Sequence, residues 1–340
     1  MSHGFLGIEI EHRINEKNRL IQLEKLIDWS RLEWRLNKLD RSGLGPTGYP
    51  LIGLLKAVIL GQWHSLSDAG LEDALRVRMD FILFCGLQHY DTPDETTLCR
   101  FRNALVQKKL LGKLLLEINN QLEMQGLKVS ISQGAILDAT VIQSAARPQS
   151  QADCEVVVNE EGSRSIKPTA IVASKDPEST WMKKGKKSYF GFKFFAVTDV
   201  QDGYIESLHV TSGHVSEMAE LETAIAELSP SRLLADKGYA SQANREYLAS
   251  RHIQDEILYK AARNKPLTDE QKAFNKRVSK ERFLVEQAFG TLKRRLSFTK
   301  AAYFGVAKTT AQAQLKAICF NLIKGLNLSK NRTRIQPLLA

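Results

Sequence analysis

Cysteine is scarce in this chain of 340 residues, and its four copies lie far apart. They form no Cys-x-x-Cys pair, which is the spacing that zinc ribbons and zinc fingers use. The pattern therefore disfavours both a structural zinc site and a disulfide framework. We expect reduced cysteines, placed mostly in the core of a cytoplasmic protein. The four are Cys85, Cys99, Cys154 and Cys319.

Long hydrophobic runs are also missing. The longest apolar stretch, 51–60, is interrupted by Lys56 and falls far short of the roughly 18 residues that a membrane helix needs. The first residues, 1–13, lack the basic and then apolar profile of a signal peptide. No Gly-x4-Gly-Lys-Ser/Thr motif occurs, so ATP is not implied. We therefore predict no membrane partner.

Acidic residues are rare in the last quarter of the chain. Residues 260–340 hold 18 Lys and Arg but only 4 Asp and Glu, a net charge of +14. The whole chain carries +10, so residues 1–259 carry 10 − 14 = −4. Charge concentrated in one region favours a nucleic acid as partner over a generally basic surface.

Residues 18 to about 128 have the apolar spacing of helices. Pro50 stands where a helix commonly begins, and Ser67 with Asp68 can cap another. We predict a bundle of five or six helices, with Trp29, Trp34 and Trp63 in helix cores.

The pattern changes near residue 133 to short β-branched and aromatic runs that alternate with helical stretches. We predict an α/β fold with a mixed sheet flanked by helices, preceded by an all-α region. The expected domains are 1–130 and 131–340, the second with a basic C-terminal helical part. A polar segment at about 147–188 is predicted to be an irregular insertion. The expected strands are 135–142, 189–198, 205–211, 232–235 and 256–259, and the expected helices are 216–228, 241–251, 281–296 and 306–326.

Three acidic residues stand in apolar surroundings. Asp138 interrupts one apolar strand, Asp236 ends another, and Glu286 lies between Val285 and Phe289, which predicts an inward-facing position. Carboxylates on separate core elements can converge on divalent cations. Taken singly, each has a plainer interpretation: a hydrogen-bonded strand residue, a turn residue and a solvated helix residue.

The order of these acids along the chain resembles that of the DDE transposases, whose catalytic domain has the ribonuclease-H-like fold. The matching stretches are ILDATVIQSA, LLADKGYAS and RFLVEQAFGTLKRR. The last contains the family's Arg-x3-Glu-x6-Lys spacing as Arg282, Glu286 and Lys293, although Ser279 stands where the family pattern has a tyrosine. The chain looks like a transposase of the bacterial "insertion sequence five" group.

Other segments extend the resemblance over nearly the whole chain. Residues 50–102, with QWHSLSDAGLEDAL and PDETTLCRFR, look like the helical domain of that group, and residues 176–198 look like its first hairpin strand. The resemblance implies that Asp138, Asp236 and Glu286 are catalytic. It also implies that they bind two Mg²⁺ ions, for which Mn²⁺ can substitute.

The implied partner is double-stranded DNA, as terminal inverted repeats and as target, with at least a homodimer acting on it. Residues 66–102 could read the repeats, or the same helices could dimerise. Basic residues near the acids are candidates to hold phosphates, although each could instead be solvated. These candidates are Arg282, Lys293, Arg294, Lys237, Lys183 and Lys184.

Two other functions stay open at this point. The chain could be a ribonuclease-H-like nuclease that hydrolyses nucleic acid without joining it to a second DNA. It could also be a catalytically inactive DNA-binding derivative, although all three acids are present.

Overall fold

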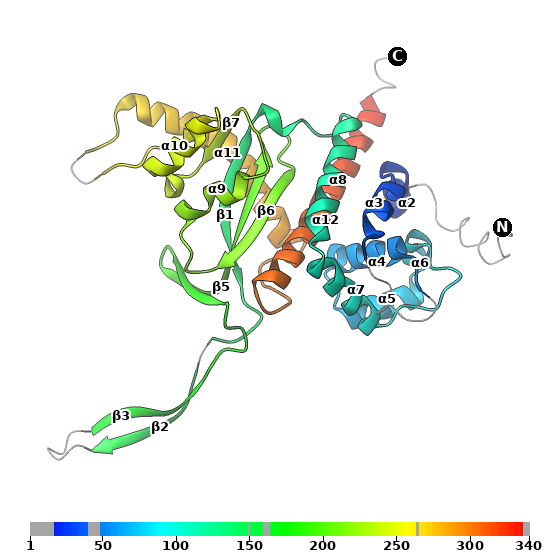
Figure 1. Ribbon diagram of the computed structural model, residues 1–340, viewed down its shortest axis with the longest axis horizontal. Coiled ribbons are helices and arrows are strands. Elements are labelled where there is room, and N and C mark those ends of the chain that lie inside the picture. The colour runs from blue at the N-terminus through cyan, green and yellow to red at the C-terminus, as the bar shows by residue number, and fades with distance from the viewer. Residues whose placement is uncertain (1–16, 40–47, 149, 159–163, 263–264, 336–340) are drawn as a thin grey trace.

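The computed structural model describes residues 17–39, 48–148, 150–158, 164–262 and 265–335. Residues 1–13, for which the sequence predicted no signal peptide, lie outside the described residues. Figure 1 shows a helical region beside a twisted sheet, with a two-stranded ribbon that projects away from both.

The helical region contains seven helices within the described ranges, where five or six were predicted. The additional helix, α6, follows α5 after the single extended residue Arg78, so the sequence reads as one longer helix. Side chains of Asn18, Asp28, Ser67 and Asp94 cap four of the helices by accepting hydrogen bonds from backbone N–H groups. The helices are α2 (Arg19–Leu26), α3 (Trp29–Leu36), α4 (Leu51–His64), α5 (Asp68–Val77), α6 (Met79–Cys85), α7 (Glu95–Gln107) and α8 (Leu110–Met124).

The main sheet confirms the predicted fold class. Strands β4 and β6 both pair with the long β5, which is antiparallel to β1, and β1 is followed by the parallel strands β7 and β8. This order of an antiparallel half joined to a parallel half is that of a ribonuclease-H-like sheet. The strands are β1 (Ala135–Gln143), β4 (Thr180–Lys184), β5 (Lys187–Asp199), β6 (Ile205–Ser212), β7 (Arg232–Ala235) and β8 (Gln254–Ile257).

Helices cover both faces of this sheet. On one face, α9 (Leu221–Ile225) and α10 (Gln242–Ser250) pack over a smaller hydrophobic cluster. On the other, α11 (Asp269–Arg295) and α12 (Val306–Ile335) belong to the main cluster. The helix predicted at 216–228 is instead a 3-10 turn at Glu217–Glu220 followed by the short α9.

The basic helix α11 begins well before the predicted residue 281. Thr268 caps it, and the Gln271 side chain returns the hydrogen bond in a capping box. The polar run after Thr268 hides this start because it has little hydrophobic pattern. The early start gives Arg282 and Glu286 a position in the middle of a long, rigid helix.

The polar insertion is regular rather than irregular, which corrects the prediction. β2 (Ser150–Val158) and β3 (Arg164–Val172) form an antiparallel two-stranded sheet that projects from the body. Backbone hydrogen bonds pair the two strands although polar residues such as Ser150, Gln151 and Lys167 interrupt their apolar pattern in sequence. After β3 the chain continues into β4, which pairs with β5 of the main sheet.

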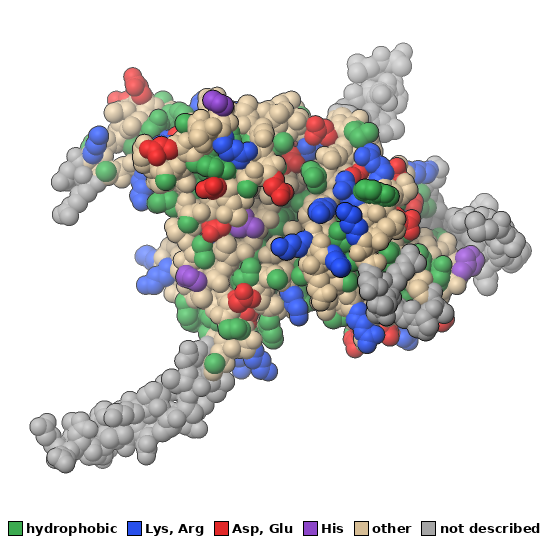
Figure 2. All heavy atoms as spheres, in the orientation of Figure 1, with side chains coloured by type: hydrophobic (Ala, Val, Ile, Leu, Met, Phe, Trp, Pro, Cys, Tyr) green, Lys and Arg blue, Asp and Glu red, His purple; other side chains and the backbone are tan. Residues whose placement is uncertain are grey.

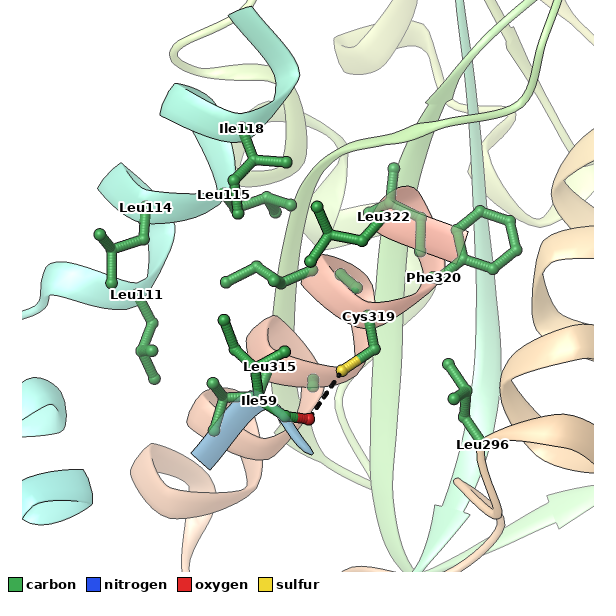
Figure 3. Packing of buried hydrophobic residues seen from close by; sticks show 14 of the residues in the cluster. Ile59, Leu111, Leu114, Leu115, Ile118, Leu296, Leu315, Cys319, Phe320 and Leu322 are labelled. Carbon is green, nitrogen blue, oxygen red and sulfur yellow. Dashed lines mark hydrogen bonds between the residues drawn. The ribbon is translucent and has the colours of Figure 1, made fainter. Parts of the chain in front are cut away.

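Helix α12 joins the helical region to the sheet. Figure 3 shows Leu315, Cys319 and Leu322 of α12 among leucines of α8, with the Cys319 thiol donating to the Ile59 carbonyl at 3.4 Å. Cys85 and Cys319 are buried and unbonded to other cysteines, as predicted, and Cys99 is half-buried. Among the described helices, none combines the length and apolar character needed to cross a membrane.

A polar cluster lies inside the same junction. Asn321 of α12 donates to Asn119 of α8 at 2.7 Å and to the Ile205 carbonyl of β6 at 2.8 Å. Its own side-chain oxygen accepts from the Ile205 N–H at 3.0 Å. One buried side chain therefore fixes two helices and a strand together.

Candidate active site

Asp138 and Asp236 occupy equivalent positions on neighbouring parallel strands. The ladder between β1 and β7 ends with the pair Leu137 and Ala235, and each aspartate is the next residue along the chain, Asp138 still within β1 and Asp236 directly after β7. β1 continues to Gln143, whereas the chain after Asp236 turns away as a short 3-10 helix. The carboxyl ends of parallel strands are where ligands bind in open α/β sheets.

Arg282 joins the two carboxylates. Its Nη2 lies 3.0 Å from Oδ2 of Asp138, and its Nη1 lies 3.5 Å from Oδ1 of Asp236. The guanidinium side chain is only 7% exposed, and it lies on the same buried face of α11 as Val278 and Val285. This places a long basic side chain between two acids that would otherwise repel one another.

Burial dominates the electrostatics of Asp138 and raises its pKa to about 6. The positive charge of Arg282 and a 2.8 Å hydrogen bond from the Ala139 N–H act in the opposite direction. The negative charges of Asp236 and Glu217 add to the rise. Asp138 is therefore an acid whose charge depends on a nearby cation.

Glu286 lies one helical turn after Arg282, but its side chain is exposed. The inward-facing prediction was wrong because Val285 and Phe289 take the buried positions on that side of α11. Residues four apart on a helix share a face, so Glu286 lies on the side of α11 that carries Arg282, one turn further along and open to solvent. Within the described part of the chain, no three His, Cys, Asp or Glu side chains already form a cage for a metal ion.

The donor set fits a hard divalent cation of the Mg²⁺ type. Two carboxylates meet through Arg282, a third is available one turn further along α11, and all offer oxygen atoms. Mg²⁺ is commonly held by one or two carboxylates together with substrate phosphates, so a complete protein cage is not required.

Lys293 reaches the same face of the sheet as Arg282. Its ammonium group donates to the Thr140 hydroxyl at 2.6 Å, and Thr140 is two residues beyond Asp138 on β1. Burial lowers the pKa of Lys293, and the charge of Lys184 lowers it further, so these two predicted phosphate ligands are near each other. Lys184 is exposed on the β4–β5 hairpin.

The other basic candidates are less closely tied to the acids. Lys183 and Lys237 are exposed. Arg294 is exposed as well, and its Nε donates to the Gly290 carbonyl of its own helix at 3.3 Å. The structure therefore brings Arg282, Lys293 and Lys184 together around the site and leaves these three at the surface.

Two groups beside the site escaped the sequence argument. Tyr239 is fully buried, and among the described residues its hydroxyl finds no hydrogen-bond partner. Burial and then the charge of Asp138 raise its pKa well above the usual value. Glu217 approaches from the 3-10 turn before α9: a Cβ added to Gly238 would lie 2.9 Å from Glu217 Oε2. The stretch Asp236-Lys237-Gly238-Tyr239 could have signalled the tyrosine, but Glu217 has no local signal.

The strand order and the paired carboxylates define a ribonuclease-H-like enzyme. Comparisons with known proteins then narrow the class. The family described as "Transposase DDE domain" matches residues 130–322, and the family described as "Transposase domain (DUF772)" matches residues 8–104. The chain belongs to the DDE transposases, and it is a transposase of an insertion sequence, an enzyme that acts on DNA.

Individual relatives carry consistent names. The chain is 43% identical over 229 residues to "Transposase for insertion sequence element IS1106" of Neisseria meningitidis serogroup B, covering 67% of this chain and 77% of that protein. Among solved structures it is similar to the piggyBac transposase synaptic complex with hairpin DNA. That match has a TM-score of 0.45 and 10% identity, and it covers 92% of this chain and 75% of the other.

Proposed function

We propose that this transposase cuts DNA at the ends of its element and joins the freed end to target DNA, using Asp138, Asp236 and Glu286. The observation that carries the proposal is the pair of carboxylates in register on β1 and β7, held by Arg282 at 3.0 and 3.5 Å. Glu286 supplies the third acid from the next turn of the same helix.

The three acids would hold two Mg²⁺ ions, and Mn²⁺ would substitute for them. When bound, such ions supply Lewis-acid stabilisation of the charge that develops as a phosphodiester is displaced in line. The protein residues contribute position and charge, so no covalent intermediate with the chain is needed.

Basic side chains around the acids would hold the DNA backbone. Arg282 and Lys293 lie on one face of α11, three turns apart, and Lys184 is near Lys293. Cationic groups at these places would neutralise phosphates on either side of the scissile bond. Lys183, Lys237 and Arg294 would add contacts at the surface.

The reaction has two displacements at phosphorus. In the first, water attacks the phosphodiester at the element end, and the bond to the 3′ oxygen breaks to leave a 3′-OH and a 5′-phosphate. In the second, that 3′-OH attacks a phosphodiester of the target, which releases a target 3′-OH. Because two inverted-repeat ends must be cut together, the active form would be a homodimer or a larger assembly on DNA in the cytoplasm.

The test is cleavage and joining of end-labelled inverted-repeat DNA with Mg²⁺. Wild type is compared with Asp138→Ala, Asp236→Ala and Glu286→Ala, each expected to abolish both steps. Glu270→Ala is the matched control because Glu270 is an exposed acid in the first turn of the same helix. Cleavage that survives the three substitutions would overturn the residue assignment.

The same assay separates the two other functions. Cleavage without joining would indicate a nuclease that only hydrolyses DNA. Tight binding of the ends by wild type without any cleavage would indicate an inactive DNA-binding derivative. Neither function has a specific structural observation in its favour.

A further inference from the structure

The helices first suggested to read DNA form an acidic surface. Residues 66–102 hold seven Asp and Glu and four Arg, a net charge of 4 − 7 = −3. Three of the four arginines already pair with acids of the same segment: Arg76 with Glu72, Arg78 with Asp80, and Arg102 with Asp68. A surface with this balance repels phosphates, so the helical region must meet DNA elsewhere if it meets DNA at all.

A basic stripe runs along α3 and the turn that follows it. Arg31, Trp34, Arg35 and Lys38 stand at the spacing i, i+3, i+4 and i+7, which places them on one helical face. Trp34 is 66% exposed, whereas the sequence predicted a core position. The core side of the helix is filled by Trp29, Leu32 and Leu36 instead.

Helix α8 extends this stripe. Arg31 and Arg35 both reach the buried Glu117 of α8, at 2.8 and 2.6 Å. Arg31 also contacts the Met124 sulfur at 3.5 Å. As the chain advances along α3 its contacts move back along α8, so the helices are antiparallel. The chain after α3, where Lys38 stands, therefore runs toward the start of α8, where Lys109 and Lys113 stand.

The charge of this face is not cancelled. Two guanidinium groups share the single carboxylate of Glu117, and the three lysines Lys38, Lys109 and Lys113 are exposed. Figure 2 shows Lys and Arg side chains gathered over α3 and α8, at the front of the helical region. We name this surface the α3–α8 face, formed by Arg31, Trp34, Arg35, Lys38, Lys109 and Lys113.

We propose that the α3–α8 face binds the sugar-phosphate backbone of duplex DNA during transposition. The inference rests on the proposed function, since it names where the helical region holds the DNA that the catalytic region cuts. Flexible lysines and forked guanidiniums suit phosphate oxygens, and the exposed indole N–H of Trp34 is a further donor. Glu117 orients both arginines, which keeps their remaining N–H groups available at the surface.

The first measurement is the binding of a labelled duplex of about 30 base pairs and arbitrary sequence over a range of salt concentrations. The test variant is Lys38→Gln with Lys113→Gln, which leaves the pairs to the buried Glu117 in place. The matched control is Arg76→Gln with Arg100→Gln, which also removes two positive charges, but from the surface formed by α5 and α7. Thermal melting of each protein checks that it is folded.

The proposal predicts that the test variant loses about tenfold in affinity at low salt. The slope of log affinity against log salt should fall by about 1.8, which corresponds to two phosphate contacts. The control variant should keep the wild-type slope. The same duplex should also quench the tryptophan fluorescence of wild type more than that of Trp34→Phe.

Failure of this proposal differs from failure of the proposed function. Equal losses in the two double variants, or a larger loss in the control, would overturn the assignment to the α3–α8 face while cleavage by wild type still stood. Retention of the wild-type slope by the test variant would overturn it as well. Wild-type protein that neither binds nor cuts duplex DNA would contradict both proposals.

Discussion

The guanidinium of Arg282 contacts the carboxylates of Asp138 and Asp236 at 3.0 and 3.5 Å. Two partly buried acids this close repel one another unless a positive charge stands beside them. Arg282 supplies that charge without a metal ion, and a cation bound by the same acids would supply it too. The two positive charges would therefore compete for one pair of carboxylates, and we expect a bound cation to free the arginine for a DNA phosphate.

Arg282→Gln tests this competition. Without bound metal, the variant should be less stable than wild type by about 3 kcal/mol, because it leaves two partly buried carboxylates without their counter-charge. Saturating Mn²⁺ should then raise its melting temperature more than that of wild type. Arg277→Gln is the control, because Arg277 stands on the same helix and pairs with Glu256 of β8 and with Glu281. An equal Mn²⁺ effect in both variants would contradict the competition.

Cation binding should also depend on pH through Asp138. Burial raises the pKa of this acid to about 6, and only the deprotonated carboxylate is a ligand. Affinity for Mn²⁺ should therefore be constant above that pH and fall about tenfold for each pH unit below it. Calorimetric titration with Mn²⁺ at several pH values from about 5 to about 8 measures this dependence of affinity on pH. Asp138→Asn should bind weakly at every pH, and a wild-type midpoint near the usual aspartate value of about 4 would contradict the assignment.

Much of the catalytic region could be predicted from sequence because its signals are local. Asp138 breaks an apolar strand and Asp236 ends another, and both positions follow from patterns a few residues long. The fold class is confirmed, and the structure places the two aspartates side by side, whereas their catalytic role stays a prediction. The spacing of Arg282 and Lys293 predicted a shared helical face, and their contacts to Asp138 and Thr140 agree with it.

What escaped prediction depends on contacts between distant segments. The exposure of Glu286 and Trp34 is decided by which helix face the rest of the fold covers, and the residue types at these positions do not reveal that face. The ribbon of β2 and β3 is defined by backbone pairing between two polar stretches of sequence, and such pairing has no strong local signal. Glu217 reaches the site only because the turn before α9 packs against Gly238.

Tyr239→Phe should make the protein more stable. The Tyr239 hydroxyl is buried, and no described residue accepts or donates a hydrogen bond to it. Removing an unpaired buried polar group while keeping the ring should raise the free energy of unfolding by about 1 kcal/mol. Tyr204→Phe is the opposite control, because the Tyr204 hydroxyl donates to the Leu127 carbonyl at 3.0 Å and its loss should cost about 1 kcal/mol. Denaturant unfolding measures both, and destabilisation of equal size would show that Tyr239 has a partner.

Asn321→Ala should weaken the junction between the helical region and the sheet. The substitution removes three hydrogen bonds of 2.7 to 3.0 Å. The Ile205 N–H and the Asn119 side-chain oxygen lose their partner in α12, whereas the Ile205 carbonyl keeps its hydrogen bond from the Asn119 amide at 2.9 Å. Each unsatisfied buried group costs about 1 to 3 kcal/mol, so a loss of about 3 kcal/mol is expected. Asn327→Ala, an exposed position on the same helix, should change stability by less than about 0.5 kcal/mol.

Because Asn321 bonds to α8 and β6 together, both regions should still unfold in one transition at a lower denaturant concentration. Separate transitions in the variant would show that α12 couples the two regions mainly through this asparagine, whereas an unchanged midpoint would show that the hydrophobic contacts of α12 are sufficient.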